Sequence, residues 1–143
     1  MMQVVVDVNI FVSAFLWGGT PERVLNILTH LQIPILWTTE IFDELETTLA
    51  KAKLAPQMNL VSKTPLQIVA EVRKKIILVH PYSDVTDSKL RDPKDLMILA
   101  AAVGGLASHV ITGDKDLLYL VTYRDIAIVT ATKFLELMNE LDH

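Results

Sequence analysis

The stretch Gln3-Val4-Val5-Val6-Asp7 places three consecutive β-branched residues directly before an acid. A continuous apolar run of this kind predicts a strand that is buried on both faces, as in a parallel sheet. An ionisable group at the end of such a strand is costly to bury unless something pairs with it. No basic residue lies next to Asp7 in the sequence, so a divalent cation would be a natural partner. This stretch therefore predicts both a parallel sheet and a site at its carboxyl edge.

Four more strands are predicted downstream, with helical patterns between most of them. They cover residues 33–37, 76–79, 109–111 and 126–129. Strands that alternate with helices predict βαβ units with right-handed crossovers. At 143 residues, the chain fits one ordinary domain. We therefore expect an α/β fold of three layers (α/β/α) around a mainly parallel five-stranded sheet, in a single domain spanning residues 1–143.

Capping residues predict where several helices begin and end. Asp95 is expected to open a helix that ends at Gly104-Gly105, because glycine commonly follows a helix C-terminus. Phe15-Leu16-Trp17, directly before Gly18-Gly19, is expected in an apolar loop. The remaining helices are expected to be capped by threonines, namely Thr20, Thr38 or Thr39, Thr64, and Thr130 or Thr132.

The composition narrows the class of protein. The chain has no cysteine, which excludes disulfides and zinc sites of the thiolate kind. No stretch approaches about 18 uninterrupted apolar residues, so a membrane span is not expected. The first residues do not have the pattern of a secretory signal peptide either, so we expect a cytoplasmic protein.

The acidic residues gather where the predicted strands end. Asp7 follows the first strand and Asp114 follows the fourth, so both should lie at the carboxyl edge of the sheet. Asp95 opens the helix before the fourth strand, and Glu44 lies in the helix after the second. Clustered carboxylates favour hard cations such as Mg²⁺ and Mn²⁺, which can activate water and stabilise charge on a phosphoryl group. The residues alone therefore predict metal-assisted phosphoryl transfer or hydrolysis.

The net charge of −4 argues against a general nucleic-acid-binding surface, which is usually basic. Acids that converge on a metal are neutralised by the metal, which leaves the basic residues available for phosphates. Lys89, Arg91 and Lys94 lie close to the acids in the sequence and either line a groove for phosphates or form a solvated surface.

Four motifs around these acids resemble the motifs of the PIN-domain family. They occur in the family's order and spread over nearly the whole chain. The third contains two acids, of which Asp95 matches the family's acid best and Asp92 competes with it. The motifs are Val5-Val6-Asp7-Val8-Asn9-Ile10-Phe11, Phe42-Asp43-Glu44-Leu45, Arg91-Asp92-Pro93-Lys94-Asp95 with the alanine-rich stretch after it, and Val110-Ile111-Thr112-Gly113-Asp114-Lys115-Asp116.

The resemblance implies a VapC-like toxin ribonuclease of a toxin–antitoxin system, an endoribonuclease that depends on Mg²⁺ or Mn²⁺. It further implies an RNA substrate, a cognate antitoxin and a homodimer or higher homo-oligomer. Lys89, Arg91 and Lys94 are then the candidate RNA contacts. By the same resemblance, the acids bind metal or orient the attacking water, Asn9 positions Asp7 or a water, and Thr112 hydrogen-bonds the acid cluster. The acids so implied are Asp7, Glu44, Asp95 and Asp114, with Asp116 and Asp92 matching less closely.

Two other function classes remain open from the sequence. A phosphatase of the haloacid dehalogenase type also begins with an aspartate after its first strand, but it places a second aspartate two residues later. Here that position is Asn9, which cannot perform acid–base catalysis. A non-catalytic PIN-like binding module is the other alternative, although such a module would be expected to have lost its acids.

Overall fold

The structure is a computed structural model that describes residues 2–86 and 90–141 of the chain. Its strands are β1 (Val4–Val6), β2 (Ile35–Trp37), β3 (Ile76–Leu78), β4 (His109–Ile111), β5 (Thr122–Tyr123) and β6 (Ile126–Val129). Its helices are α1 (Val8–Trp17), α2 (Gly19–His30), α3 (Thr39–Leu49), α4 (Ala55–Leu60), α5 (Pro65–Lys75), α6 (Pro93–Gly104), α7 (Lys115–Leu120) and α8 (Ala131–Leu141), with a 3-10 turn η1 (Ala52–Leu54) before α4.

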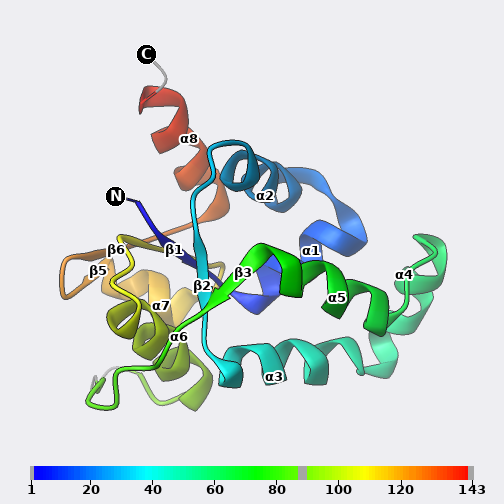
Figure 1. Cartoon of the computed structure of the whole chain (residues 1–143), viewed down its shortest axis with the longest axis horizontal. Helices are drawn as coiled ribbons and strands as arrows, with labels where there is room; N and C mark the ends of the chain where they lie inside the picture. The colour runs from blue at the N-terminus through cyan, green and yellow to red at the C-terminus, as the bar shows by residue number, and fades with distance from the viewer. Residues whose placement is uncertain (1, 87–89, 142–143) are drawn as a thin grey trace.

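The strands form one sheet in the order β3-β2-β1-β4-β6-β5. Every neighbouring pair is parallel except β5 and β6, which are antiparallel. Helix α6 packs against β1, β2 and β4, while α8 packs on α2, and α2 packs on α1. Figure 1 shows α6 and α7 on one side of the sheet and α1, α2 and α8 on the other. The α/β fold with helices on both faces of a mainly parallel sheet is therefore confirmed.

The sheet differs from the expected one in its number of strands. It has six strands, whereas five were expected. The additional strand β5 is only two residues long and pairs with β6 through Thr122 opposite Ala127 and Tyr123 opposite Ile126. The turn between them holds Arg124 and Asp125 at φ of 47° and 66°. Positive φ at both central residues is the backbone of a tight hairpin turn, for which asparagine and glycine are the usual sequence signal. That signal is missing here, so the strand was not predicted.

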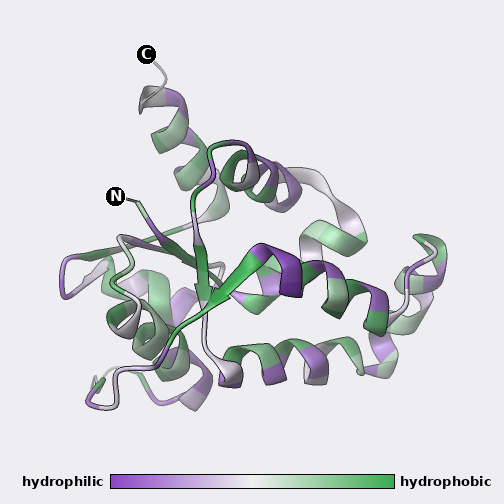
Figure 2. Ribbon diagram, in the orientation of Figure 1, coloured by the Kyte–Doolittle hydropathy of each residue, from purple (hydrophilic) through white to green (hydrophobic). Residues whose placement is uncertain are grey.

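The central strands carry the hydrophobic core. All three residues of β1 are fully buried, and so are most residues of β2 and β4. In Figure 2 the strands are largely hydrophobic, whereas the helices carry hydrophobic and hydrophilic stripes. This is the pattern expected of a parallel sheet covered by amphipathic helices. None of the helices in the described ranges has the length and hydrophobicity that spanning a bilayer requires.

Several helix boundaries agree with the capping signals. The Thr38 side chain caps α3 by accepting the Ile41 N–H, and Thr64 caps α5 in a reciprocal capping box with Gln67. At the start of the last helix, the Thr130 hydroxyl accepts the Lys133 N–H at 3.0 Å. Threonine caps therefore predicted three of the four helix starts assigned to them.

Three helix boundaries differ from the sequence prediction. Helix α2 begins at Gly19 with Gly18 as its N-cap, so Thr20 lies inside the first turn. Gly18 adopts φ of 70°, which lets α1 end and α2 begin at one residue. Phe15-Leu16-Trp17 is the last turn of α1 and not a loop: Leu16 is buried, while Trp17 is 59 % exposed. Helix α6 starts two residues before Asp95, at Pro93.

Candidate active site

The middle of the sheet is where the strand order reverses. From β1 the chain continues to β2 on one side, and from β4 it continues to β6 on the other. In open α/β sheets, ligands bind beyond the carboxyl ends of the strands at such a reversal. Asp7 follows β1 directly and Thr112 follows β4 directly. The Asp7 N–H donates to the Ile111 carbonyl at 2.9 Å, so the two strand ends are joined at this edge.

Thr112 connects the acids that follow the two strands. Its hydroxyl donates to Oδ2 of Asp7 at 2.7 Å and accepts the backbone N–H of Asp114 at 3.0 Å. The Thr112 side chain has no solvent exposure. One buried hydroxyl therefore fixes the orientation of Asp7 and the start of the turn that carries Asp114.

Asp7 is the N-cap of α1, and its Oδ1 accepts the backbone N–H of Asn9 at 3.4 Å. Burial raises the pKa of the Asp7 carboxyl, the hydrogen bond from Thr112 lowers it, and the nearby Asp114 raises it further, so that the net shift is upward. The sequence prediction assigned Asn9 a positioning role. The bond to Asp7 is made by the Asn9 backbone, and the Asn9 residue is exposed.

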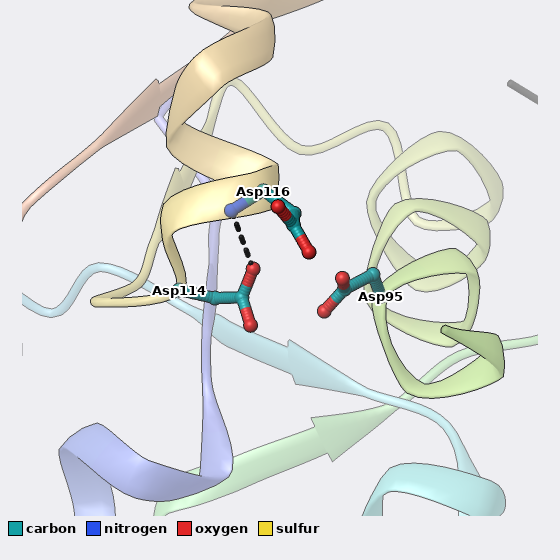
Figure 3. Close-up of side chains that lie close together, drawn as sticks. All are labelled: Asp95, Asp114 and Asp116. Carbon is teal, nitrogen blue, oxygen red and sulfur yellow. Dashed lines mark hydrogen bonds between the residues drawn. The ribbon is translucent and has the colours of Figure 1, made fainter. Parts of the chain in front are cut away.

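Three carboxylates come together beside this pair (Figure 3). Asp95, Asp114 and Asp116 each offer one oxygen, and these oxygens all lie within 4.8 Å of one another. Asp114 caps α7, and its Oδ1 accepts the N–H groups of Asp116 at 2.9 Å and Leu117 at 3.1 Å. Asp95 enters from the first turn of α6 and is 6 % exposed, whereas Asp116 is exposed.

Asp95 is the acid most affected by this crowding. Burial and, to a smaller extent, the charges of Asp114, Asp92, Asp116 and Asp7 together raise the pKa of Asp95 to about 6. An ionised Asp95 is therefore unfavourable unless a cation offsets the neighbouring charges. The donor set around it consists of carboxylate oxygens, which suits a hard divalent cation such as Mg²⁺ or Mn²⁺.

One pocket of about 220 Å³ collects the four acids that the sequence assigned to the site. Glu44 lies on its wall, outside the group of three whose oxygens converge. The Glu44 carboxylate accepts a hydrogen bond from the Thr48 hydroxyl at 3.3 Å and pairs with the Lys94 ammonium at 3.0 Å. The hydrogen bond from Lys94 to Glu44 and the charge of Glu44 raise the pKa of Lys94. The acids on the pocket are Asp7, Glu44, Asp95 and Asp114, together with Asp92.

The other residues that the sequence assigned to the site either have a structural role or do not line the pocket. Asp92 caps α6 by accepting the Lys94 backbone N–H at 2.9 Å, so its carboxylate has a structural use even though it reaches the pocket. Arg91 is exposed and does not line the pocket. Lys89, the third candidate RNA contact, lies outside the described residues.

Sequence reasoning did not assign two polar residues that line the pocket, Thr48 and Lys51. They follow Glu44 at spacings of four and seven residues, which places all three on one face of a helix. The helical spacing from Glu44 was the signal that could have found them.

The comparisons with known proteins agree with this architecture. The family model described as PIN domain matches residues 3–116, a span that includes each assigned acid from Asp7 to Asp116. No curated protein gives a significant match.

Among solved structures, a similar fold occurs in a chain of the crystal structure of VapBC2 from Rickettsia felis bound to a DNA fragment from their promoter. The similarity covers 90 % of the present chain and 98 % of that chain, with a TM-score of 0.62 and 14 % sequence identity. At this identity the likeness concerns the fold alone.

Proposed function

The chain belongs to the PIN-domain family, and on that premise we propose that it is a Mg²⁺- or Mn²⁺-dependent endoribonuclease that hydrolyses RNA phosphodiester bonds. PIN domains are generally nucleases. The observation that carries the proposal is the gathering of Asp7, Glu44, Asp95 and Asp114 on one pocket at the reversal of strand order. Carboxylates without histidine or cysteine suit a hard cation better than zinc or copper.

In the proposed mechanism, Asp95, Asp114 and Asp116 would hold the divalent ion, because their oxygens converge within 4.8 Å. When bound, the ion supplies activation of water and neutralises charge that develops on the phosphate. Asp114 keeps Oδ2 available for this role, since its Oδ1 is occupied by two backbone N–H groups of α7.

Asp7, whose Oδ1 accepts the Asn9 N–H at 3.4 Å, would orient the attacking water or help to hold the ion. The Thr112 hydroxyl holds the other oxygen, Oδ2, at 2.7 Å, so the carboxylate is already oriented before substrate binds. Glu44 would serve at the opposite wall of the pocket, where the Thr48 hydroxyl and the Lys94 ammonium hold it. In this scheme the chain positions ion, water and phosphate with pre-oriented side chains.

The test is cleavage of a mixed RNA pool by the wild-type chain and by the Asp7→Asn variant, each with Mn²⁺, Mg²⁺ or EDTA. We expect the wild type alone to cleave, and only with metal. Equal cleavage by both chains would point to a contaminating nuclease or to a different site. Metal binding in calorimetry with no cleavage of any RNA would favour a PIN-like binding module, and turnover of p-nitrophenyl phosphate would favour a phosphatase.

We further propose that the chain is the toxin of a type II toxin–antitoxin pair, acts in the cytoplasm and associates with a cognate antitoxin. The support is the family together with the fold shared with a chain of VapBC2 from Rickettsia felis. Induced expression should arrest growth, and co-expression of the protein encoded by the adjacent gene should restore it. Growth arrest that persists in the Asp7→Asn variant would contradict the toxin assignment. The expected homodimer or higher homo-oligomer stays a prediction that light scattering can test.

A further inference from the structure

Along α3 and the residues directly after it, the side chains that line the pocket change in chemical type. Glu44, Thr48 and Lys51 all line the pocket and follow one another at helical spacing. Helix α3 ends at Leu49 with Ala50 as its C-cap, and the Lys51 N–H donates to the Thr48 carbonyl at 3.1 Å, so Lys51 directly follows the last turn of the helix. This wall therefore presents an acid, then a hydroxyl, then an ammonium group.

The two ammonium groups on the pocket are in different states. Lys94 is engaged by Glu44 at 3.0 Å. Lys51 is exposed, and no acid lies within ion-pair distance of it among the side chains of residues 2–86 and 90–139. Lys51 is therefore the pocket's available cation for a group that comes from solution.

The distance between Glu44 and Lys51 indicates which group from solution Lys51 would bind. Seven residues of helix at about 1.5 Å each place Lys51 about 10 Å from Glu44 along the axis. In Figure 1, α3 leads away from α6 and α7, the elements that carry Asp95 and Asp116. Lys51 thus lies at the end of the pocket remote from α6 and α7, where a neighbouring phosphate of the same strand would lie.

The charge of the pocket makes such a contact useful. Five carboxylates line it, and they repel a polyanion that approaches before the metal has neutralised them. A cation at the end of the pocket remote from the aspartates attracts the strand without competing with the metal for them. Phosphate contacts of this kind fix the position of a nucleic acid and carry no sequence information.

We infer that Lys51 binds a backbone phosphate next to the scissile one, so that the pocket takes an oligonucleotide strand in preference to a mononucleotide or dinucleotide. The inference rests on the proposed ribonuclease function. Lys51 is a binding residue in this scheme, and it takes no part in the bond-breaking step.

The test compares Lys51→Ala with Lys53→Ala, a matched loss of one exposed lysine that lies two residues away and does not line the pocket. On a decanucleotide RNA with Mn²⁺, we expect Lys51→Ala to raise KM about tenfold with little change in kcat. The loss of kcat/KM should be severalfold smaller on a dinucleotide, which lacks the neighbouring phosphate. Lys51→Arg should retain most of the affinity, and Lys53→Ala should behave as the wild type.

A binding measurement separates this contact from catalysis. In the Asp7→Asn background, fluorescence anisotropy of a labelled decanucleotide should show weaker binding on addition of Lys51→Ala. The slope of log affinity against log salt should also fall by about 1. Equal affinity and equal salt slope with and without Lys51, in a chain whose wild type cleaves RNA, would overturn the inference and leave the proposed function standing. A wild type that neither cleaves nor binds RNA would contradict both.

Discussion

Asp95 is buried among other acids, and its pKa of about 6 lies above the ordinary value of 3.8. The folded chain therefore holds this proton more tightly than the unfolded chain does. The ionised carboxylate lowers the free energy of unfolding above pH 6, and this penalty is relieved as the pH falls from about 6 toward 4. Asp7, whose pKa is also raised, acts in the same direction.

We accordingly expect Asp95→Asn to stabilise the metal-free protein near neutral pH by about 1–3 kcal/mol. The advantage should vanish near pH 4, where Asp95 of the wild type is largely protonated. Urea denaturation in EDTA at both pH values measures this difference. A variant that is less stable than the wild type at neutral pH would show that Asp95 is not under net electrostatic strain.

Asp43 and Glu44 are adjacent acids with opposite surroundings. Glu44 lines the pocket and pairs with Lys94, whereas Asp43 is exposed and does not line the pocket. We expect Glu44→Gln to reduce kcat/KM for RNA at least tenfold, because the neutral amide can neither bind a cation well nor hold Lys94. Asp43→Asn is the matched control and should leave the rate within twofold. Similar losses in both variants would indicate a general effect of charge on α3.

Asp7, Asp95 and Asp114 were predictable because each lies just after a strand or in the first turn of a helix whose position the sequence signals. Three consecutive valines, Val4 to Val6, predict a strand, so Asp7 was expected at its carboxyl end. The pairing of Glu44 with Lys94 was not predictable, because it depends on how α3 and α6 face each other across 50 residues of chain. Lys51 was missed because an exposed lysine is not by itself a sign of a pocket, and its spacing of seven residues from Glu44 was the only local signal that could have indicated it.

At the scale of elements, close packing around Gly104 leaves no room for a side chain at the end of α6. A Cβ at this last residue of α6 would collide with the carbonyl oxygen of His80, and the Tyr82 N–H bonds to the Ala100 carbonyl of the same helix at 3.0 Å. We expect Gly104→Ala to destabilise the protein by about 1–3 kcal/mol, the usual cost of an overpacked site. Gly113→Ala, with nothing within 4 Å of the added methyl, should change stability by less than about 0.5 kcal/mol. Equal melting temperatures for the two variants would show that the segment at His80 yields easily.

Sequence patterns predicted the elements unevenly. The strands β1, β4 and β6 and the capped helices α3 and α5 had clear signals, because burial on both faces and threonine caps are local properties. Helix α1 buries Val8, Ile10, Val12, Ala14 and Leu16, and this spacing of two imitates a strand. It also buries Phe11, so it is apolar nearly all round and lacks the stripe by which surface helices are recognised.

At the scale of the whole molecule, a net charge of −4 is concentrated partly in one pocket. A cation that binds there relieves the repulsion and binds only the folded chain, so it should raise the stability. At a metal concentration of about 100 times Kd the gain is about 2.7 kcal/mol. We expect Mn²⁺ to raise the Tm of the wild type and to have little effect on Asp114→Asn. Asp125→Asn, a loss of one exposed acid far from the pocket in the β5–β6 turn, should respond as the wild type.

The hydrogen bond from Thr112 to Asp7 spans 105 positions of the sequence. A ribosome that has made Asp7 must add 105 more residues to reach Thr112, and it makes Asp114 and Asp116 only after that. A chain still under synthesis therefore has its first carboxylate without the others, and it cannot assemble the pocket until β4 pairs with β1. Under the proposed ribonuclease function, the nascent chain would therefore be unable to cleave RNA before β4 has been made and paired with β1.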